Sequence, residues 1–339
     1  MKLEETEISG GVYAYYMACY KQYWLTYFSQ SDTPEFWNKE ADGITNEDIL
    51  TQVSEYSIKK RIAANHLFEK AELLLTEEEY IAIERLISNI KAAAEDGNGI
   101  SDDEMFKALG VDENDLKTVL IIDSKVGALQ EYLYGEDGVE KITDEKKEAY
   151  YKENYTRIKL IYLINGDYVR DENGNIEYDE NGSAQVKEIS DERYEEKYAL
   201  AEDILAKIKA GDDIDKYIEE YSEHLKKDEY KNGHYICSAN GYDNEICSAA
   251  EKLDTGEADI YPTSYGIYVI QKLEPDPYAW KNEENKAGGD FDNFETLVLE
   301  KEFDDYLKPW CDLVEVDKSV TGKYKMEDLP YTFSWQYVF

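Results

Sequence analysis

The first half of the chain shows the spacing of amphipathic helices. From about residue 8 to residue 155, apolar positions recur three and four residues apart, which is typical of helices with one buried face. Thr76 with Glu79, and Ser101 with Glu104, have the spacing of capping boxes, in which a side-chain oxygen accepts a helix-terminal amide. The pattern therefore predicts a helical scaffold for this half.

From residue 156 the apolar positions recur every two residues instead of every three or four. In TRIKLIYLING (156–166), Tyr162 belongs to a strongly apolar face, and the opposite face is mostly apolar too, which favours a central strand. Long and short helical patterns follow over 190–222, then a loop that contains His224 and His234, and a third helix over 243–253. Two closing strands complete the predicted order: strand, hairpin, two helices, loop, helix, two strands.

A repeated DENG segment interrupts this order after the first strand. In RDENGNIEYDENGSAQ (170–185) each Asn-Gly favours a positive φ, so a hairpin or two successive turns is predicted. A calcium loop is the alternative, because Asp171, Asn173 and Asn175 alternate as oxygen donors. However, Gly182 stands where a helix-loop-helix calcium site needs its bidentate glutamate.

The C-terminal part carries a further helix and an aromatic tail. After a polar linker, 291–310 has amphipathic spacing, and the tail 313–339 is aromatic and partly strand-like. This tail is too apolar to remain in solvent, so we expect it to dock on the protein.

The charge balance excludes two classes of partner. The 339 residues hold 37 basic and 76 acidic side chains, a formal charge of -39, which repels phosphate backbones and anionic lipid headgroups. Nucleic acid and membrane-surface binding are therefore not expected, and the acids are interpreted as a solvated surface. Hydrophobic residues still make up 42% of the chain, enough for real cores.

Targeting signals are not evident in the sequence. No run of about 18 apolar residues is present, and the apolar GVYAYYMACY follows acidic residues rather than a basic leader. We therefore expect a trimmed start, with any export signal or lipid anchor removed before Met1.

Metal, cofactor and nucleophile motifs are also not found. The four cysteines form no CxxC and have no zinc spacing with histidine, so packed thiols are expected, with a Cys19–Cys311 disulfide possible if the two chain ends meet. No HExxH, GxSxG or GxxxxGK[ST] occurs. No metal or cofactor is predicted.

Three segments together resemble the parvulin-type (PpiC) peptidyl-prolyl isomerases: TDEKKEAYYKENYTRIKLIYLI, KIKAGDDIDKYIEEYS, and NGHYICSANGYDNEICSAAEKLDTGEADIYPTSYGIYVIQKL. With its helical flanks, the chain looks like extracytoplasmic foldases of the PrsA and SurA kind. The resemblance implies an α+β fold. A helical SurA/PrsA-like chaperone domain (1–155 plus 276–339) would carry an inserted parvulin-like β-α-α-α-β-β domain (156–275), with a hairpin insertion near 166–189.

The resemblance also implies a site whose usual residues are replaced. Active parvulins carry a histidine in the first strand and another in the last, and these positions hold Tyr162 and Tyr268 here. His234 occupies the position of an acidic or thiol residue. These three are the predicted catalytic set. The structural alternatives are a packed cross-strand pair for the tyrosines and a surface turn for His234.

The predicted proline pocket is also altered. Tyr242 and Ile246 stand where methionine and phenylalanine are usual, and Glu251 replaces another phenylalanine. Tyr235 and Tyr265 complete the predicted substrate-binding set. Proline isomerisation needs no nucleophile or cofactor, only an apolar pocket that favours the twisted amide.

The leading hypothesis is an extracytoplasmic foldase or chaperone, a cell-surface lipoprotein or membrane-anchored protein of a bacterium. Its partners would be unfolded or extended polypeptides, including Xaa-Pro segments. The alternatives are an active isomerase with a tyrosine-rich centre, and a surface adhesin or calcium-dependent binding module.

Overall fold

The chain divides into two compact units. The computed structural model describes residues 1–98, 106, 110–228, 230, 232–287 and 289–330. We call Met1–Lys141 with the chain from Glu300 onward the helical unit, and Ile142–Leu299 the sheet unit. The α+β class predicted from the sequence is confirmed. The predicted domain boundaries at 156 and 275 stay a prediction.

The helical unit is built from amphipathic helices with side-chain caps. The Thr76–Glu79 capping box is confirmed, because Glu79 Oε2 accepts from the Thr76 amide at 2.6 Å and Thr76 Oγ1 accepts from the Glu79 amide at 3.2 Å. The Ser101–Glu104 box lies outside the described residues. The main elements are α1 (Gly10–Tyr27), α2 (Pro34–Trp37), α3 (Asn46–Lys70), α4 (Glu77–Asn98), α6 (Glu113–Tyr134), α13 (Lys318–Thr321) and η3 (Met326–Asp328), and α12 (Phe294–Cys311) belongs to this unit from Glu300 onward.

Helix α1 is the central element of this unit. Its first half is buried on every side, which is typical of a helix inside a core rather than on its surface. Tyr15 and Met17 pack there with Ile58 of α3 and Leu116 of α6. Ser9 caps the helix by accepting from the Val12 amide at 3.1 Å.

A buried lysine joins α1 to the C-terminal segment of the described chain. Lys21 has no exposed surface, and its Nζ donates to the carbonyl oxygens of Met326 at 2.5 Å and Leu329 at 2.8 Å. The same Nζ lies 2.8 Å from Asp32 Oδ2, so the buried charge is paired. The segment up to Leu329 is thereby held against α1.

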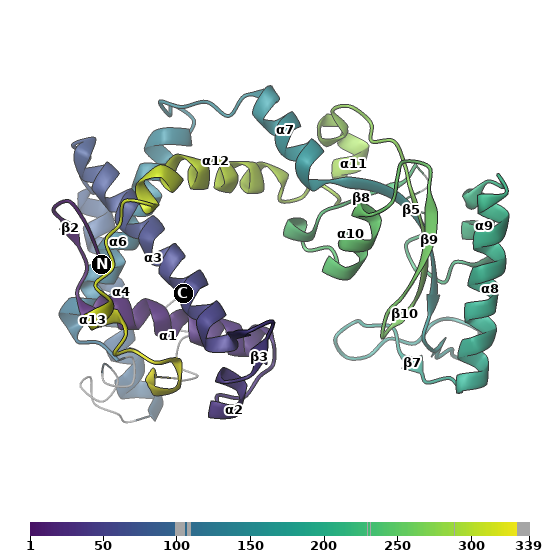
Figure 1. The fold of residues 1–339 in the computed structure, drawn as a ribbon, viewed down its shortest axis with the longest axis horizontal. Coiled ribbons are helices and arrows are strands. Elements are labelled where there is room, and N and C mark those ends of the chain that lie inside the picture. Colours follow the sequence, from purple (N-terminus) through teal and green to yellow (C-terminus); the bar gives the residue numbers. More distant parts are fainter. Residues whose placement is uncertain (99–105, 107–109, 229, 231, 288, 331–339) are drawn as a thin grey trace. The chain divides into compact units, whose positions relative to one another are not determined.

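The sheet unit is a four-stranded antiparallel sheet in the order β8-β5-β10-β9 (Figure 1). Helices α8 and α9 cover one face and α10 covers the other. Strand β8 was missed by the sequence analysis, which predicted a loop at this point. The elements are β5 (Thr156–Ile164), α8 (Asp191–Lys209), α9 (Ile214–Tyr221), β8 (His234–Ile236), α10 (Asn244–Glu251), β9 (Ala258–Pro262) and β10 (Gly266–Lys272).

Strand alternation assigns residues of β5 and β10 to two cores. Ile161 and Val269, which pair across the strands, face α8 and α9 and have no exposed surface. Tyr162 and Tyr268 are the next pair along and face α10. Because the side-chain period of a strand is two, this register places both tyrosines on the α10 face.

The DENG repeat forms two turns in a hairpin on this unit. Strands β6 (Asp167–Tyr168) and β7 (Val186–Lys187) pair antiparallel at its base. Asp171 Oδ1 accepts from the amides of Asn173 and Asn175, each at 2.8 Å, and Asp179 repeats this arrangement in the second turn. The two carboxylates therefore close the turns.

An aromatic cluster fills the end of the sheet unit next to α7 (Asp144–Asn154). Phe294 lies within 6.0 Å, between ring centroids, of Tyr150, Tyr155, Trp280 and Phe291. Helix α7, which the sequence analysis assigned to the helical domain, lies inside this compact unit. The short helices here are η2 (Ala279–Lys281) and α11 (Glu283–Ala287).

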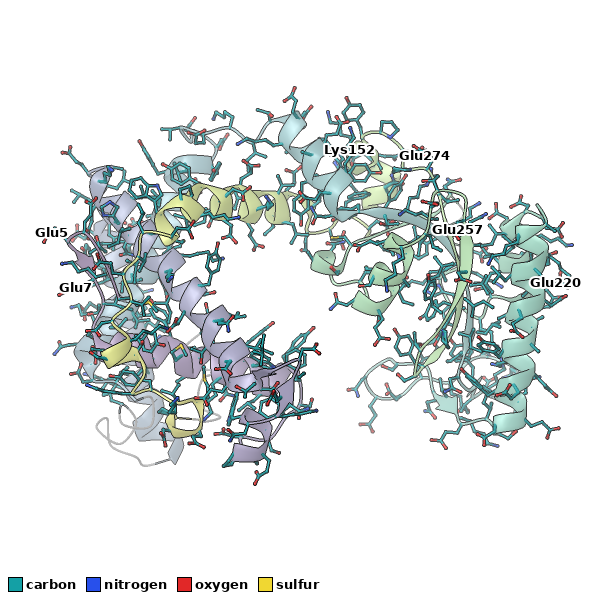
Figure 2. The ribbon with its side chains drawn as sticks, viewed as in Figure 1. Glu5, Glu7, Lys152, Glu220, Glu257 and Glu274 are labelled. Carbon is teal, nitrogen blue, oxygen red and sulfur yellow. The ribbon has the colours of Figure 1, made fainter. Side chains whose placement is uncertain are left out.

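The molecular surface is acidic. Five glutamates labelled in Figure 2 are exposed: Glu5, Glu7, Glu220, Glu257 and Glu274. Within the described ranges, none of the helices combines the length and apolar character needed to cross a bilayer. Cys19, Cys237, Cys247 and Cys311 are free thiols, so the Cys19–Cys311 disulfide is not formed.

Candidate functional site

Two of the predicted catalytic residues, Tyr162 and Tyr268, form a stacked pair. Tyr162 of β5 and Tyr268 of β10 are direct partners in the strand register. Their ring centroids lie 4.7 Å apart with an interplanar angle of 26°. The cross-strand pair named as the structural alternative for these tyrosines is therefore present. Gly266 makes room for the stack, because a Cβ there would lie 2.2 Å from the Tyr162 ring.

Both phenols of this pair stay protonated, and therefore neutral, near neutral pH. Burial raises the pKa of Tyr162 to about 12 and raises the pKa of Tyr268 well above its ordinary range. The Tyr162 hydroxyl donates to the backbone carbonyl of Tyr265 at 2.8 Å. Its single proton is thus committed to the protein's own backbone.

Tyr265 and Ile246, both in the predicted substrate-binding set, are linked through the cap of α10. The Tyr265 hydroxyl donates to Asp243 Oδ2, and Asp243 Oδ1 accepts from the amides of Glu245 at 2.8 Å and Ile246 at 3.0 Å. Burial opposes the charge on Asp243, but these hydrogen bonds hold its pKa below the usual range. The Ile246 side chain is only 1% exposed and belongs to the core between α10 and the sheet.

The other predicted residues lie around an open pocket at the β8 edge. This pocket has a volume of about 310 Å³. His234, Tyr235 and Tyr242 line it, together with Asn240 and Asp290. The predicted set is therefore divided between this pocket and the tyrosine stack, although both lie on the α10 face of the sheet.

Asp290 is the site residue that the sequence analysis missed. Its Oδ1 lies 2.6 Å from Nδ1 of His234, and the two side chains are 5% and 12% exposed. Asp290 Oδ2 accepts from the Tyr235 amide at 2.8 Å, so this carboxylate is held against the start of β8. No local motif marks Asp290, because it follows the linker after β10 and reaches β8 only through the fold.

His234 is not the surface turn residue that the sequence also allowed. It is the first residue of β8 and pairs with Ile158 of β5. Tyr230 and Tyr242 enclose its ring, with centroid distances of 3.9 and 4.9 Å. The carboxylate beside Nδ1 and the two neighbouring rings restrict the orientation of the imidazole.

Glu251 stands where the resemblance led us to expect a wall of the proline pocket. Glu251 is the last residue of α10, and its side chain is exposed rather than lining a buried wall. Within the described residues, no group of three or more His, Cys, Asp or Glu side chains is arranged to hold a metal ion.

Among the comparisons with known proteins, the one with solved structures finds similar chains. No protein-family model and no curated protein matches the chain. PrsA from Bacillus subtilis is 18% identical, with 87% of this chain and 99% of that chain covered and a TM-score of 0.25. The peptidylprolyl isomerase PrsA from Bacillus cereus is 16% identical, with 88% and 100% covered and a TM-score of 0.30. The foldase protein PrsA from Streptococcus pneumoniae is 16% identical, with 85% and 98% covered and a TM-score of 0.26.

Proposed function

We propose that this protein is a chaperone-type foldase that binds unfolded secreted polypeptides through its helical unit and does not isomerise proline. The observation that carries the proposal is an apolar stripe on α3. Ile49, Val53 and Tyr56 are 36%, 53% and 40% exposed. We call these three residues the α3 stripe. Their spacing of four and three residues places them on one face of the helix.

An exposed apolar stripe is unfavourable in water and gains stability when another apolar surface covers it. Soluble proteins rarely leave contiguous apolar faces exposed unless these bind something. The chain's charge of -39 keeps the protein itself soluble and favours neutral or basic clients over acidic ones. An extended segment of an unfolded client supplies apolar side chains that the α3 stripe can cover, and this requires no sequence readout.

Polar substitution of the α3 stripe should weaken client binding. In Val53→Asp with Tyr56→Asp, two half-buried contacts worth about 1 kcal/mol each are lost. Light scattering can follow the aggregation of a basic client such as reduced lysozyme. We expect the concentration of the variant that suppresses half of this aggregation to be at least roughly tenfold higher than that of the parent protein. Leu74→Asp is the matched control, because Leu74 is 88% exposed in the loop between α3 and α4. Equal protection by the double variant and the control would contradict the proposal.

A second candidate function, an active isomerase, is favoured by the His234–Asp290 pair. An imidazole fixed by a carboxylate beside a pocket of about 310 Å³ can donate one hydrogen bond to a bound peptide. Tyr162 of the tyrosine stack offers no comparable donor, because its proton is held by the Tyr265 carbonyl.

We expect no acceleration of Xaa-Pro isomerisation by the protein, measured by NMR exchange on a proline peptide series. The tyrosine stack and the exposed Glu251 remove the apolar pocket that lowers the barrier of about 18 to 20 kcal/mol. Acceleration that is lost in His234→Ala but kept in Tyr162→Phe with Tyr268→Phe would replace this proposal with the second candidate.

A further inference from the structure

We propose that a hollow on the helical unit binds a primary alkylammonium group, such as the end of a lysine side chain. The hollow has a volume of about 250 Å³ and lies between α3, α6 and the hairpin of β1 (Lys2–Leu3) and β2 (Thr6–Glu7). We call it the α3–α6 hollow. The inference goes beyond the proposed function, because it concerns a different surface. Asn65 in this hollow follows Tyr56 by about two and a half helical turns, which places it on the opposite side of α3 from the α3 stripe.

The hairpin that closes the hollow is held in place by hydrogen bonds. The amide of Lys2 donates to the carbonyl oxygen of Glu315 at 2.9 Å, and the amide of Glu315 donates to the carbonyl oxygen of Lys2 at 2.8 Å. Thr6 Oγ1 donates to Glu69 Oε2 of α3 at 3.3 Å. The hollow is therefore bounded by elements with fixed positions inside one compact unit.

Four isoleucine side chains form the apolar part of the lining. Ile62 of α3 is 1% exposed and Ile122 of α6 is 7% exposed, and Ile121 and Ile8 line the hollow beside them. A lysine side chain buries its aliphatic stem along apolar surface while its ammonium stays at a polar group. The isoleucines offer the surface that such a stem needs.

Asn65 supplies a hydrogen-bond acceptor in this apolar surrounding. The residue is only 4% exposed, and its Nδ2 donates to the carbonyl oxygens of Arg61 at 2.9 Å and Ile122 at 3.1 Å. Among the described residues, no group donates to Asn65 Oδ1, and this oxygen still has accessible surface. Since the residue is otherwise buried and lines the hollow, its Oδ1 is open to a ligand there. An ammonium carries three N–H donors for such an oxygen.

The charges around the hollow favour a cation. Arg61 and Lys125, the two basic side chains in the lining, are each already paired with a carboxylate oxygen at 2.8 Å. Glu5 and Glu7 also line the hollow and are labelled on the hairpin in Figure 2. Neither of them forms an ion pair with any described residue. Two unpaired carboxylates beside a concave surface raise the local concentration of cations.

An alkylammonium matches this lining better than a metal ion or a guanidinium. In the part of the chain that the structure describes, no set of three or more acidic, histidine or cysteine side chains could hold a metal. A guanidinium is planar and prefers two parallel hydrogen bonds to one carboxylate, whereas an ammonium is a compact charge on a flexible four-carbon stem. One amide oxygen among isoleucines, with carboxylates nearby, suits the second group.

An NMR titration of the whole ¹⁵N-labelled chain tests the site. The probe is Nα-acetyl-lysine N-methylamide, which carries one ammonium and no other charge. We expect it to bind with a Kd of about 1 mM and to shift the Asn65 side-chain amide and the Thr6 backbone amide most strongly. The norleucine analogue keeps the stem without the ammonium and should bind at least about tenfold more weakly. Equal binding of the two probes, or shifts confined to other parts of the surface, would overturn the proposal.

A charge variant separates the hollow from the general acidity of the protein. Glu5→Gln with Glu7→Gln should weaken binding of the lysine probe about fivefold, because both unpaired carboxylates leave the lining. Glu77→Gln with Glu78→Gln is the matched control, with the same change of charge at two exposed positions of α4 outside the lining. This control should bind the probe like the parent chain. Equal weakening in the two variants would show that the probe responds only to net charge, and the proposal would fail.

Two sources can supply the ammonium: a lysine of a bound polypeptide and a free diamine. Titration with 1,5-diaminopentane compares them, and we expect the lysine probe to bind at least as tightly. Tighter binding of the diamine supports the ammonium site and assigns it to free amines, whereas binding of neither probe overturns it. The α3 stripe variant Val53→Asp with Tyr56→Asp should bind the lysine probe like the parent chain, so this inference and the proposed function can fail separately.

Discussion

Replacing Lys21 with methionine should lower the free energy of unfolding of the helical unit by about 3 to 5 kcal/mol. Methionine fills similar space, but it leaves Asp32 without its cation and takes the ammonium away from the carbonyls of Met326 and Leu329. Unsatisfied buried polar groups are expensive, so the cost is electrostatic rather than steric.

The effect should be local to the helical unit. Urea unfolding can be monitored by hydrogen exchange in separate peptides. Peptides of α1 give the urea midpoint of the helical unit alone, and peptides of β5 give that of the sheet unit. Lys117→Met is the matched control, because Lys117 pairs with Glu84 at the surface, where both side chains are about half exposed. Such a pair contributes about 0 to 1 kcal/mol. Equal midpoints for the two variants would show that the Lys21 contacts are not needed for stability.

Replacing Phe294 with alanine should destabilise the sheet unit by about 3 to 5 kcal/mol. Phe294 is 2% exposed and contacts the rings of Tyr150, Tyr155, Trp280 and Phe291. Its removal leaves a cavity whose aromatic walls come from different elements and cannot close it easily.

Two further variants separate a cavity from a general loss of apolar surface. Phe294→Leu keeps most of the volume and should cost less than about 1.5 kcal/mol. Tyr178→Ala removes an exposed ring of the same unit and should stay within about 0.5 kcal/mol of the parent chain. For all three variants, hydrogen exchange of the β5 and β10 amides at increasing urea concentration gives the unfolding midpoint of the sheet unit. A Phe294→Ala midpoint close to that of Tyr178→Ala would mean that the aromatic cluster is not a core.

Local patterns explain why much of the fold was predictable. Alternation over 156–164 and 266–272 predicted strands, and the Thr76–Glu79 spacing predicted a helix start, because each depends on residues near one another in the chain. The Tyr162–Tyr268 contact was predicted as well, but only from the order of elements in a resembling family. Spacing within either strand carries no information about its partner.

Strand β8 and Asp290 were missed for a related reason. Three residues after Gly233 are too few to show a period, and β8 is a strand only because β5 offers a free edge to His234 and its neighbours. Asp290 lies 56 residues beyond His234 in the sequence, so its place at the candidate site depends on how the linker after β10 returns to β8.

The sequence by itself determined the acidic surface, the positions of the long helices and the two central strands, because composition and periodicity act locally. Only the tertiary structure decided that Lys21 and Lys197 are buried, since a lysine in a helix is expected to remain solvated. Each ammonium replaces its water with two backbone carbonyls and a carboxylate, supplied for Lys197 by Ile164, Gly166 and Glu223. Distant parts of the chain provide these oxygens, so no pattern around either lysine could indicate them.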